Sequence, residues 1–368
     1  MPISVFNPTI GRKDMDSVLT CMVSDLIGPG DLNDTLIEKL AVHFPHSGGI
    51  CLRDSSRALE VVLELMLQNQ TIQTGSGVLI SALAPSYYYR VITKLGLQPV
   101  VCDVDLLTGV ASREELTSKA PSGALIIVDY PVGNYPDVEL LRSFNLPIIE
   151  DISCSVGTAN VVSASPIGDD IQIEETQKEA GEEATKFVPG TLGTFIILSM
   201  EANCLITSGG GAVLLASSKG DFQKLNRYAS SLEPSLFLPD INAALAVVQS
   251  GSLASRLAKR QSYYDIFSSS VKKGNHKIMK STLSGGNFFY SFPVVIEVGM
   301  SDVVAYCKKK GVETALAFTN TVLDLIDPEG NQFPHALSVK LKTILFPLYS
   351  LLGSANATLI GKVLLTLP

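Results

Sequence analysis

Short apolar runs bounded by polar or glycine-containing segments recur along the first 216 residues. Such runs are typical of strands that a parallel sheet buries on both faces. The clearest cover residues 147–150, 194–200 and 211–216, and a turn over 201–210 joins the last two. In open α/β sheets, ligands bind just outside the carboxyl ends of the strands. We therefore expect any chemistry to lie where Asp151, at the end of the first run, meets that turn.

Between the apolar runs the pattern takes a helical period. An amphipathic helix is expected over 13–23 and a second over 32–44, which Pro45 ends because proline cannot continue a helix. A strand end at Cys51 leads into a helix that runs to Met66, with Asp54, Ser55 and Ser56 as candidate N-caps. Residues 238–267 predict one long helix.

Length and composition indicate a globular chain. Its 368 residues are 46% hydrophobic and only 17% charged, which is enough core for two α/β domains. We place a large domain at 1–225 and a long connecting helix with a small C-terminal α/β domain at 226–368. Residues 161–188 are acid-rich and poor in aromatics, which favours a solvated surface insertion, with a lid as the alternative.

Charge and segment patterns narrow the partners and the compartment. A net charge of −8 argues against nucleic acid and against an anionic membrane surface. No apolar run reaches the roughly 20 residues of a membrane-spanning helix, and the first residues lack the layout of a signal peptide. Six cysteines without metal-type spacing fit reduced thiols, so we expect a cytoplasmic protein without a metal.

Three segments carry a family resemblance: "IEDISC" at 149–154, "LSMEANC" at 198–204 followed by "GGA", and "LPDINAAL" at 238–245. They resemble the DegT/DnrJ/StrS sugar aminotransferases, which are pyridoxal phosphate (PLP) enzymes of fold type I, and the resemblance spans nearly the whole chain. It implies an aspartate aminotransferase-like α/β fold. That fold has a large domain on a mostly parallel, mixed seven-stranded sheet and a smaller C-terminal α/β domain. It also implies a homodimer that builds its sites across the interface.

The resemblance assigns roles to positions in this chain. Asp151 matches the aspartate that pairs with the protonated pyridine nitrogen of PLP and keeps the ring an electron sink. Ser55 and Ser56 fall in the motif that grips the cofactor's phosphate at a helix start, where free N–H groups favour an anion. Asp54 enters beside them, and its charge repels a phosphate unless Arg57 offsets it. An ordinary helix cap explains these residues equally well.

Further positions depart from the family's pattern. Pro85 stands where the family stacks an aromatic residue on the pyridine ring, and Tyr87 or Tyr88 could take that role. A tyrosine cluster on a helix is more often core or interface. Cys154 replaces a glutamine on the ring's hydroxyl side, and Ser199 is a further candidate contact. Cys154 and Cys204 could also form a metal or redox pair, although two buried thiols are the more common outcome.

The family's catalytic lysine would fall at Asn203 or at Cys204, and neither side chain forms a Schiff base. No lysine occurs between Lys186 and Lys219, and none of the four histidines is near the turn. A transaminase needs that lysine to hold the cofactor and move a proton. The sequence therefore predicts a degenerate family member that binds a nucleotide-sugar or a protein partner.

Two alternatives remain at this stage. One is an enzyme that holds PLP or its amine form non-covalently, through Asp151, Ser56 and Ser199, and acts on a nucleotide-linked keto sugar. The other is an inactive subunit that pairs with an active paralogue.

Overall fold

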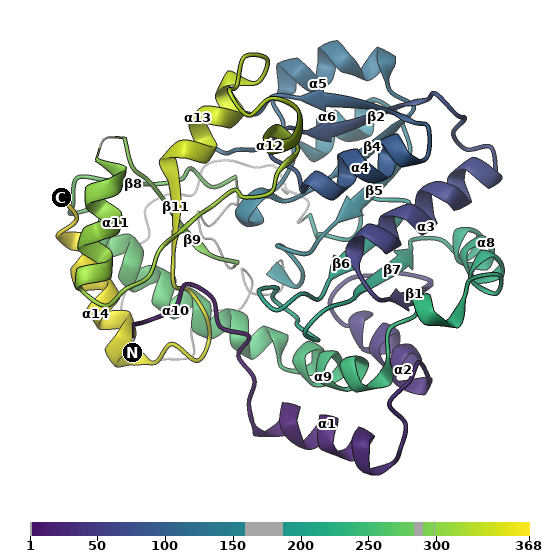
Figure 1. The fold of residues 1–368 in the computed structure, drawn as a ribbon, viewed down its shortest axis with the longest axis horizontal. Coiled ribbons are helices and arrows are strands. Elements are labelled where there is room, and N and C mark those ends of the chain that lie inside the picture. Colours follow the sequence, from purple (N-terminus) through teal and green to yellow (C-terminus); the bar gives the residue numbers. More distant parts are fainter. Residues whose placement is uncertain (1, 159–186, 283–289, 298) are drawn as a thin grey trace, which may run out of the picture.

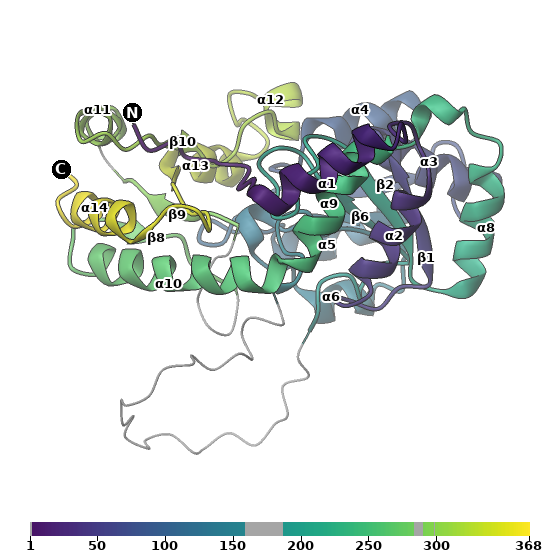
Figure 2. The ribbon, with the colours of Figure 1, turned by 90° about the horizontal axis from the view of Figure 1, so that it is seen from below.

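A computed structural model describes residues 2–158, 187–282, 290–297 and 299–368. The acid-rich insertion expected at 161–188 lies outside these ranges except for its last two residues. Two β-sheets organise the described chain, and helices lie on both faces of the larger one (Figure 1). The smaller sheet lies beside it and is built from the last third of the sequence (Figure 2).

The larger sheet has seven strands, which follow one another across it in the order β1-β7-β6-β5-β4-β2-β3. These are β1 (Gly48–Leu52), β7 (Ala212–Ala216), β6 (Phe195–Ser199), β5 (Ile148–Asp151), β4 (Leu125–Val128), β2 (Gly77–Ser81) and β3 (Gln98–Cys102). Only β7 runs against its neighbours. All other adjacent pairs are parallel. The expected mostly parallel, seven-stranded sheet is thus confirmed.

The strands form because their sequences are almost wholly apolar, and all residues of β4, β5, β6 and β7 are buried. The three runs predicted at 147–150, 194–200 and 211–216 coincide with β5, β6 and β7 to within one residue at each end. β5 ends one residue later than predicted, so that Asp151 is its last residue rather than the residue after it.

Nine helices accompany this sheet within the described ranges. They are α1 (Arg12–Val23), α2 (Asp31–Leu40), α3 (Ser55–Gln68), α4 (Ser86–Lys94), α5 (Arg113–Lys119), α6 (Val138–Ser143), α8 (Lys219–Ala229), α9 (Asp240–Gly251) and α10 (Leu253–Val271). Helices α3, α4 and α8 share one apolar cluster with the sheet. Helices α2 and α9, and separately α5 and α6, contribute to clusters on the opposite face. The helix predicted over 32–44 is shorter, since the chain turns after Leu40.

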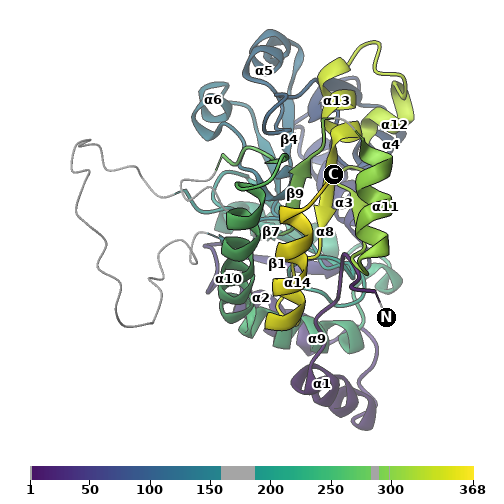
Figure 3. The same cartoon turned by 90° about the vertical axis from the view of Figure 1, so that its left-hand side faces the viewer.

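The smaller sheet is antiparallel, with the strands β8 (Lys277–Ile278), β9 (Phe292–Val295), β10 (Ala315–Leu316) and β11 (Thr343–Phe346) in the order β10-β11-β9-β8. The described residues of this part form four helices: α11 (Met300–Lys309), α12 (Val322–Ile326), α13 (Pro334–Lys342) and α14 (Ser354–Leu365). Helix α14 packs along α10, and α11 lies alongside α14 (Figures 1 and 3).

The prediction of a single helix over 238–267 is wrong. The chain forms α9 and α10 with a break at Ser252, whose ψ of 1° is not helical. The Ser252 hydroxyl donates to the carbonyls of Val248 and Gln249 at 3.2 and 3.1 Å. Serine hydroxyls compete in this way with the backbone ladder, and the preceding Gly251 lowers helix propensity further. The second helix also runs past Phe267, to Val271.

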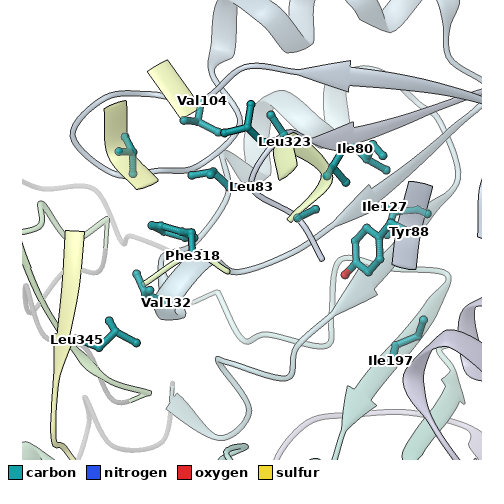
Figure 4. Close-up of a cluster of buried hydrophobic side chains, with 14 of the residues drawn as sticks. Ile80, Leu83, Tyr88, Val104, Ile127, Val132, Ile197, Phe318, Leu323 and Leu345 are labelled. Atoms are coloured by element: carbon teal, nitrogen blue, oxygen red, sulfur yellow. The ribbon is translucent and has the colours of Figure 1, made fainter. Parts of the chain in front are cut away.

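The two sheets share one apolar core. Phe318 and Leu345 from the C-terminal part gather with Val132 from the larger sheet's side, as Figure 4 shows. Hydrogen bonds between the two parts of the chain supplement this packing. Asp103, which follows β3, accepts hydrogen bonds from the backbone N–H groups of His335 and Ala336 at 3.1 and 2.8 Å. It therefore caps the first turn of α13. Among the described residues, no helix is both long enough and apolar enough to cross a membrane.

Candidate active site

A pocket of about 400 Å³ opens at the carboxyl ends of the central strands. Its walls come from the segments that follow β2, β4, β5 and β6, and residues 315–321 of the C-terminal part face them. This is the edge at which ligands bind in open α/β sheets. The expectation that Asp151 and the turn after β6 meet at one place is confirmed, since both Asp151 and Asn203 line this pocket.

Asp151 is buried, and both of its carboxylate oxygens accept hydrogen bonds. Oδ2 accepts from the hydroxyls of Tyr87 and Tyr88 at 3.2 and 2.8 Å. Oδ1 accepts from the backbone N–H of Ser153 at 3.1 Å and also from the Ser153 hydroxyl. Four protein donors thus surround one carboxylate, and charge-assisted hydrogen bonds of this kind are the strong ones.

The two tyrosines lie in the first turn of α4. Tyr88 is fully buried, and Figure 4 shows it within the apolar cluster that also holds Ile127 and Ile197. The rings of Tyr87 and Tyr88 meet edge to face with centroids 4.9 Å apart. Burial, reinforced by the charge of Asp151, raises the pKa of both hydroxyls, so they remain donors at neutral pH.

Asp129 is a second carboxylate on the same pocket, and the sequence analysis missed it. It directly follows β4, as Asp151 ends the neighbouring β5. Within the described ranges, no other residue forms a hydrogen bond or ion pair with its carboxylate. Burial, and then the negative charge of Asp151, raise the pKa of Asp129 to about 7. Strongly shifted carboxyl groups concentrate at functional sites.

Ser199 and Cys204 join the site through Ser153. The backbone N–H of Ser199 donates to the Ser153 hydroxyl at 2.8 Å, and the Ser199 side chain lies beside the Cys204 thiol. Burial raises the pKa of the Cys204 thiol to about 12, which leaves it protonated at neutral pH. A protonated thiol is a poor nucleophile and a poor metal ligand.

Cys154 and Tyr290 form the neighbouring wall of the pocket, where their side chains lie close to each other. Burial raises the pKa of Cys154 well above its ordinary value, with the nearby Cys204 adding to the shift. All six cysteines are free thiols. Among the described residues, no group of three or more His, Cys, Asp or Glu side chains is arranged to hold a metal ion.

The N-terminus of α3 is closed by a residue of the chain itself. Asp54 is the N-cap, and its Oδ1 accepts from the backbone N–H of Arg57 at 2.7 Å. The Arg57 guanidinium points instead to Glu60, with Nη1 and Oε2 2.6 Å apart. Ser55 is buried beside Tyr87, and Ser56 is half-buried in the first turn. Of the three predicted N-cap candidates, Asp54 is the one that caps.

The segment 315–321 is fastened to the start of α4. The Ser86 hydroxyl donates to Asn320 Oδ1 at 2.8 Å, and the Ser86 N–H donates to the Asn320 carbonyl at 2.9 Å. Pro85 pairs with Thr321 in an isolated antiparallel bridge. Pro85 therefore lines the pocket as part of this junction.

The structure brings most of the predicted site residues to one place. Hydrogen bonds link Asp151 to Tyr87, Tyr88 and, through Ser153, to Ser199, while Cys154 lines the same pocket and Cys204 lies beside Ser199. Ser55 is buried near Tyr87, and its hydroxyl has no hydrogen-bond partner among the described residues. Asn203 is exposed at the pocket's mouth. Asp129, Tyr290 and Asn320 were missed. The rule that pointed to Asp151, an acid at the end of a buried strand, would also have found Asp129.

Comparison with solved structures shows that the fold is that of the PLP-dependent aminotransferases. The aminotransferase TlmJ from Streptoalloteichus hindustanus superposes with a TM-score of 0.79 at 19% identity, covering 99% of this chain and 97% of that one. The PseC aminotransferase of Helicobacter pylori, involved in pseudoaminic acid biosynthesis, gives 0.79 at 13% identity, with 99% and 98% covered.

A dehydratase has the same fold. The E. coli GDP-4-keto-6-deoxy-D-mannose-3-dehydratase with bound hydrated PLP gives a TM-score of 0.79 at 14% identity, and 99% of this chain and 100% of that chain are covered. Residues 8–364 match the DegT/DnrJ/EryC1/StrS aminotransferase family. The chain belongs to that family.

Proposed function

We propose that this protein has kept the scaffold of the DegT/DnrJ/EryC1/StrS family without its lysine-dependent transamination. In this proposal it binds a small sugar-like molecule in the pocket at the ends of β4 and β5. The observation that carries the proposal is the set of hydrogen bonds that the Asp151 carboxylate accepts. Tyr87, Tyr88 and Ser153 already occupy the carboxylate that a pyridine nitrogen would need. The pocket volume, about 400 Å³, falls within the usual range of roughly 300–1,000 Å³ for ligand sites.

The residues around the pocket do not fit PLP in the usual way. A phosphate needs free N–H groups or cations, and the α3 N-terminus already holds the carboxylate of Asp54. Arg57, in the first turn of that helix, is paired with Glu60. Among the described residues that line the pocket, none is a lysine or an arginine. The family resemblance puts the lysine position at Asn203 or at Cys204, and neither side chain can form an imine.

The alternative is an enzyme with PLP or its amine form held non-covalently, acting on a nucleotide-linked keto sugar. Family membership and the PLP-bound dehydratase of the same fold favour it. So does the position of Asp151 at the end of β5, facing the pocket. In this case Ser56 and Ser199 would have to hold the cofactor in place of a lysine.

The first prediction separates the two functions by spectroscopy. The protein is incubated with PLP, and its visible absorbance is recorded before and after borohydride. We expect no reducible imine band and no pyridoxyl group on the protein by mass spectrometry, because the aligned positions lack an amine. An imine reduced onto any lysine would overturn the proposal.

A band that dialysis removes would favour the alternative instead. In that case Asp151→Asn should weaken the band, because the amide is uncharged and no longer stabilises a protonated pyridine nitrogen. The control is Asp265→Asn, which makes the same change in net charge at an exposed residue of α10 and should leave the band unchanged.

We further propose that the protein is a homodimer. The first helix and the turn after it expose a row of large apolar side chains, and Met15, Leu19 and Met22 lie on one face at helical spacing. Val23 and Leu26 extend this surface, with 76% and 64% of their area exposed. Exposed apolar surface of this extent on one element marks an interaction site. We assign it to a second copy of the chain.

The second prediction concerns this surface. Light scattering after gel filtration should give twice the chain mass for the wild-type protein and the single chain mass for the double variant Leu19→Glu, Met22→Glu. Two buried charges facing an apolar partner surface would cost several kcal/mol. Leu107→Glu, which changes a residue of similar exposure on another surface, should stay dimeric. A monomeric wild-type protein would contradict the proposal.

A further inference from the structure

The charged side chains that line the pocket at the ends of β4 and β5 are all acidic. The pocket is lined by two carboxylates, Asp129 and Asp151, with no lysine or arginine among its described lining residues. Asp151 is satisfied by four donors from the protein. Asp129 receives none from any other described residue. One carboxylate of the pair is therefore structural, and the other is available to a ligand.

The groups that face Asp129 do not compensate its charge. They are Asp151 from β5, the hydroxyl of Tyr88 from α4 and the thiol of Cys154 after β5. The Tyr88 hydroxyl already donates a hydrogen bond to Asp151. Burial raises the pKa of the Cys154 thiol well above its ordinary value, so the thiol stays neutral beside Tyr290. Asp129 thus lacks a cationic partner, and a buried carboxylate without one is costly to ionise.

The rest of the wall fits a small hydroxylated ring. Asn203, Thr319 and Asn320 supply amide and hydroxyl groups at the mouth. Phe6, Tyr88 and Tyr290 supply aromatic surface. Aromatic faces attract a cation as well as apolar C–H groups. A phosphate or a second carboxylate would instead meet two acidic side chains, and no lysine or arginine is among the described residues that line the pocket.

We propose that the pocket binds a primary ammonium group carried on a small hydroxylated ring, with Asp129 as its charge partner. This rests on the proposed binding function and specifies the class of ligand. An amino sugar has the required chemistry. Because the ammonium ion favours ionised Asp129, binding near pH 6 should release a proton from that carboxyl.

The test uses isothermal titration calorimetry with glucosamine, N-acetylglucosamine and glucose 1-phosphate on the full chain. Glucosamine should bind at least about tenfold more tightly than the other two, the difference expected for one charge-assisted hydrogen bond. Its affinity should rise roughly tenfold from pH 5.5 to pH 7 as Asp129 ionises. At pH 6 the measured heat should change with the ionisation enthalpy of the buffer, which reports the released proton.

Asp129→Asn should abolish both the preference for glucosamine and the proton release. Asp265→Asn, with the same change in net charge at an exposed position, should retain both. Equal binding of the three sugars, stronger binding of the phosphate, an unaffected Asp129→Asn variant or no heat from glucosamine would each overturn the inference. The binding function itself would survive if a neutral sugar bound and no PLP imine formed. A PLP imine would instead remove the function on which the inference rests.

Discussion

Asp129→Asn should increase the free energy of unfolding at pH 8 by about 2–4 kcal/mol. The pKa of Asp129 rises from an ordinary 3.8 to about 7 in the folded protein, because the carboxylate is buried beside Asp151. A pKa difference of this size corresponds to roughly 4 kcal/mol at most, and the partial exposure of Asp129 to the pocket reduces that figure. Urea unfolding of both proteins measures the difference.

The pH dependence has a defined sign. Because the folded pKa of Asp129 lies above the unfolded value, its favourable contribution is complete below about pH 4 and is lost as the pH rises through 7. Wild-type and variant should therefore have similar stabilities near pH 4, and the variant's advantage should grow up to about pH 8. A constant difference across this range, or a less stable variant at pH 8, would contradict the assignment.

The same carboxylate is proposed to bind the ligand, so this variant should be more stable and bind less. A group that costs stability when empty and is relieved by a ligand is typical of functional sites, which are seldom optimal for folding. A ligand ammonium would supply the charge that the chain does not place beside Asp129. The stability measurement and the calorimetry therefore both test whether the Asp129 carboxylate lacks a cationic partner in the unliganded protein.

Most of the larger sheet could be predicted from the sequence, for a physical reason. Strands β6 and β7 are buried along their whole length, so their apolar runs are nearly continuous and end abruptly. The neighbouring β5 begins with two buried isoleucines and ends on two buried acids. The break between α9 and α10 could not be predicted in the same way. It depends on the hydroxyl of Ser252, whose bonds to the backbone leave no trace in the apolar pattern.

The site was predictable only where chemistry coincides with a strand end. Asp151 met that condition, and Asp129 met it too but was missed because no family motif drew attention to it. The hydrogen-bond partners of the site residues could not be predicted in this way. Asn320 reaches Ser86 across 234 positions of sequence, and the hydroxyls of Tyr87 and Tyr88 reach Asp151 across more than 60. Such contacts follow from the packing of the two sheets, which local patterns do not specify.

Glu150→Ala should lower the free energy of unfolding by about 3–5 kcal/mol, the largest loss that we expect from a single substitution. Glu150 is fully buried in β5, and the sequence analysis assigns it no role. Its Oε1 accepts from the Tyr130 hydroxyl at 2.5 Å and from the Gly190 N–H at 2.7 Å. Its Oε2 accepts from the N–H groups of Leu192 and Gly193 at 2.9 and 2.8 Å.

Alanine would leave these four donors buried without an acceptor, and each lost partner costs about 1–3 kcal/mol before the structure relaxes. Glu150→Gln should cost less, because its amide oxygen still accepts from one pair of donors while its NH₂ group faces the other pair. Tyr130→Phe removes a single donor and should cost about 1 kcal/mol. Urea unfolding should rank the three variants in that order.

The exposed Glu114→Ala change on α5 is the matched control and should stay within about 0.5 kcal/mol of the wild-type protein. If Glu150→Ala and Glu114→Ala had equal effects, the carboxylate would not be what fixes residues 190–193 to the sheet. Because these residues lead directly into β6, Glu150 also sets where that strand begins beside β5. Losing it should therefore disturb Ser199 and Asp151 together, and glucosamine binding should weaken in Glu150→Ala but not in Glu114→Ala.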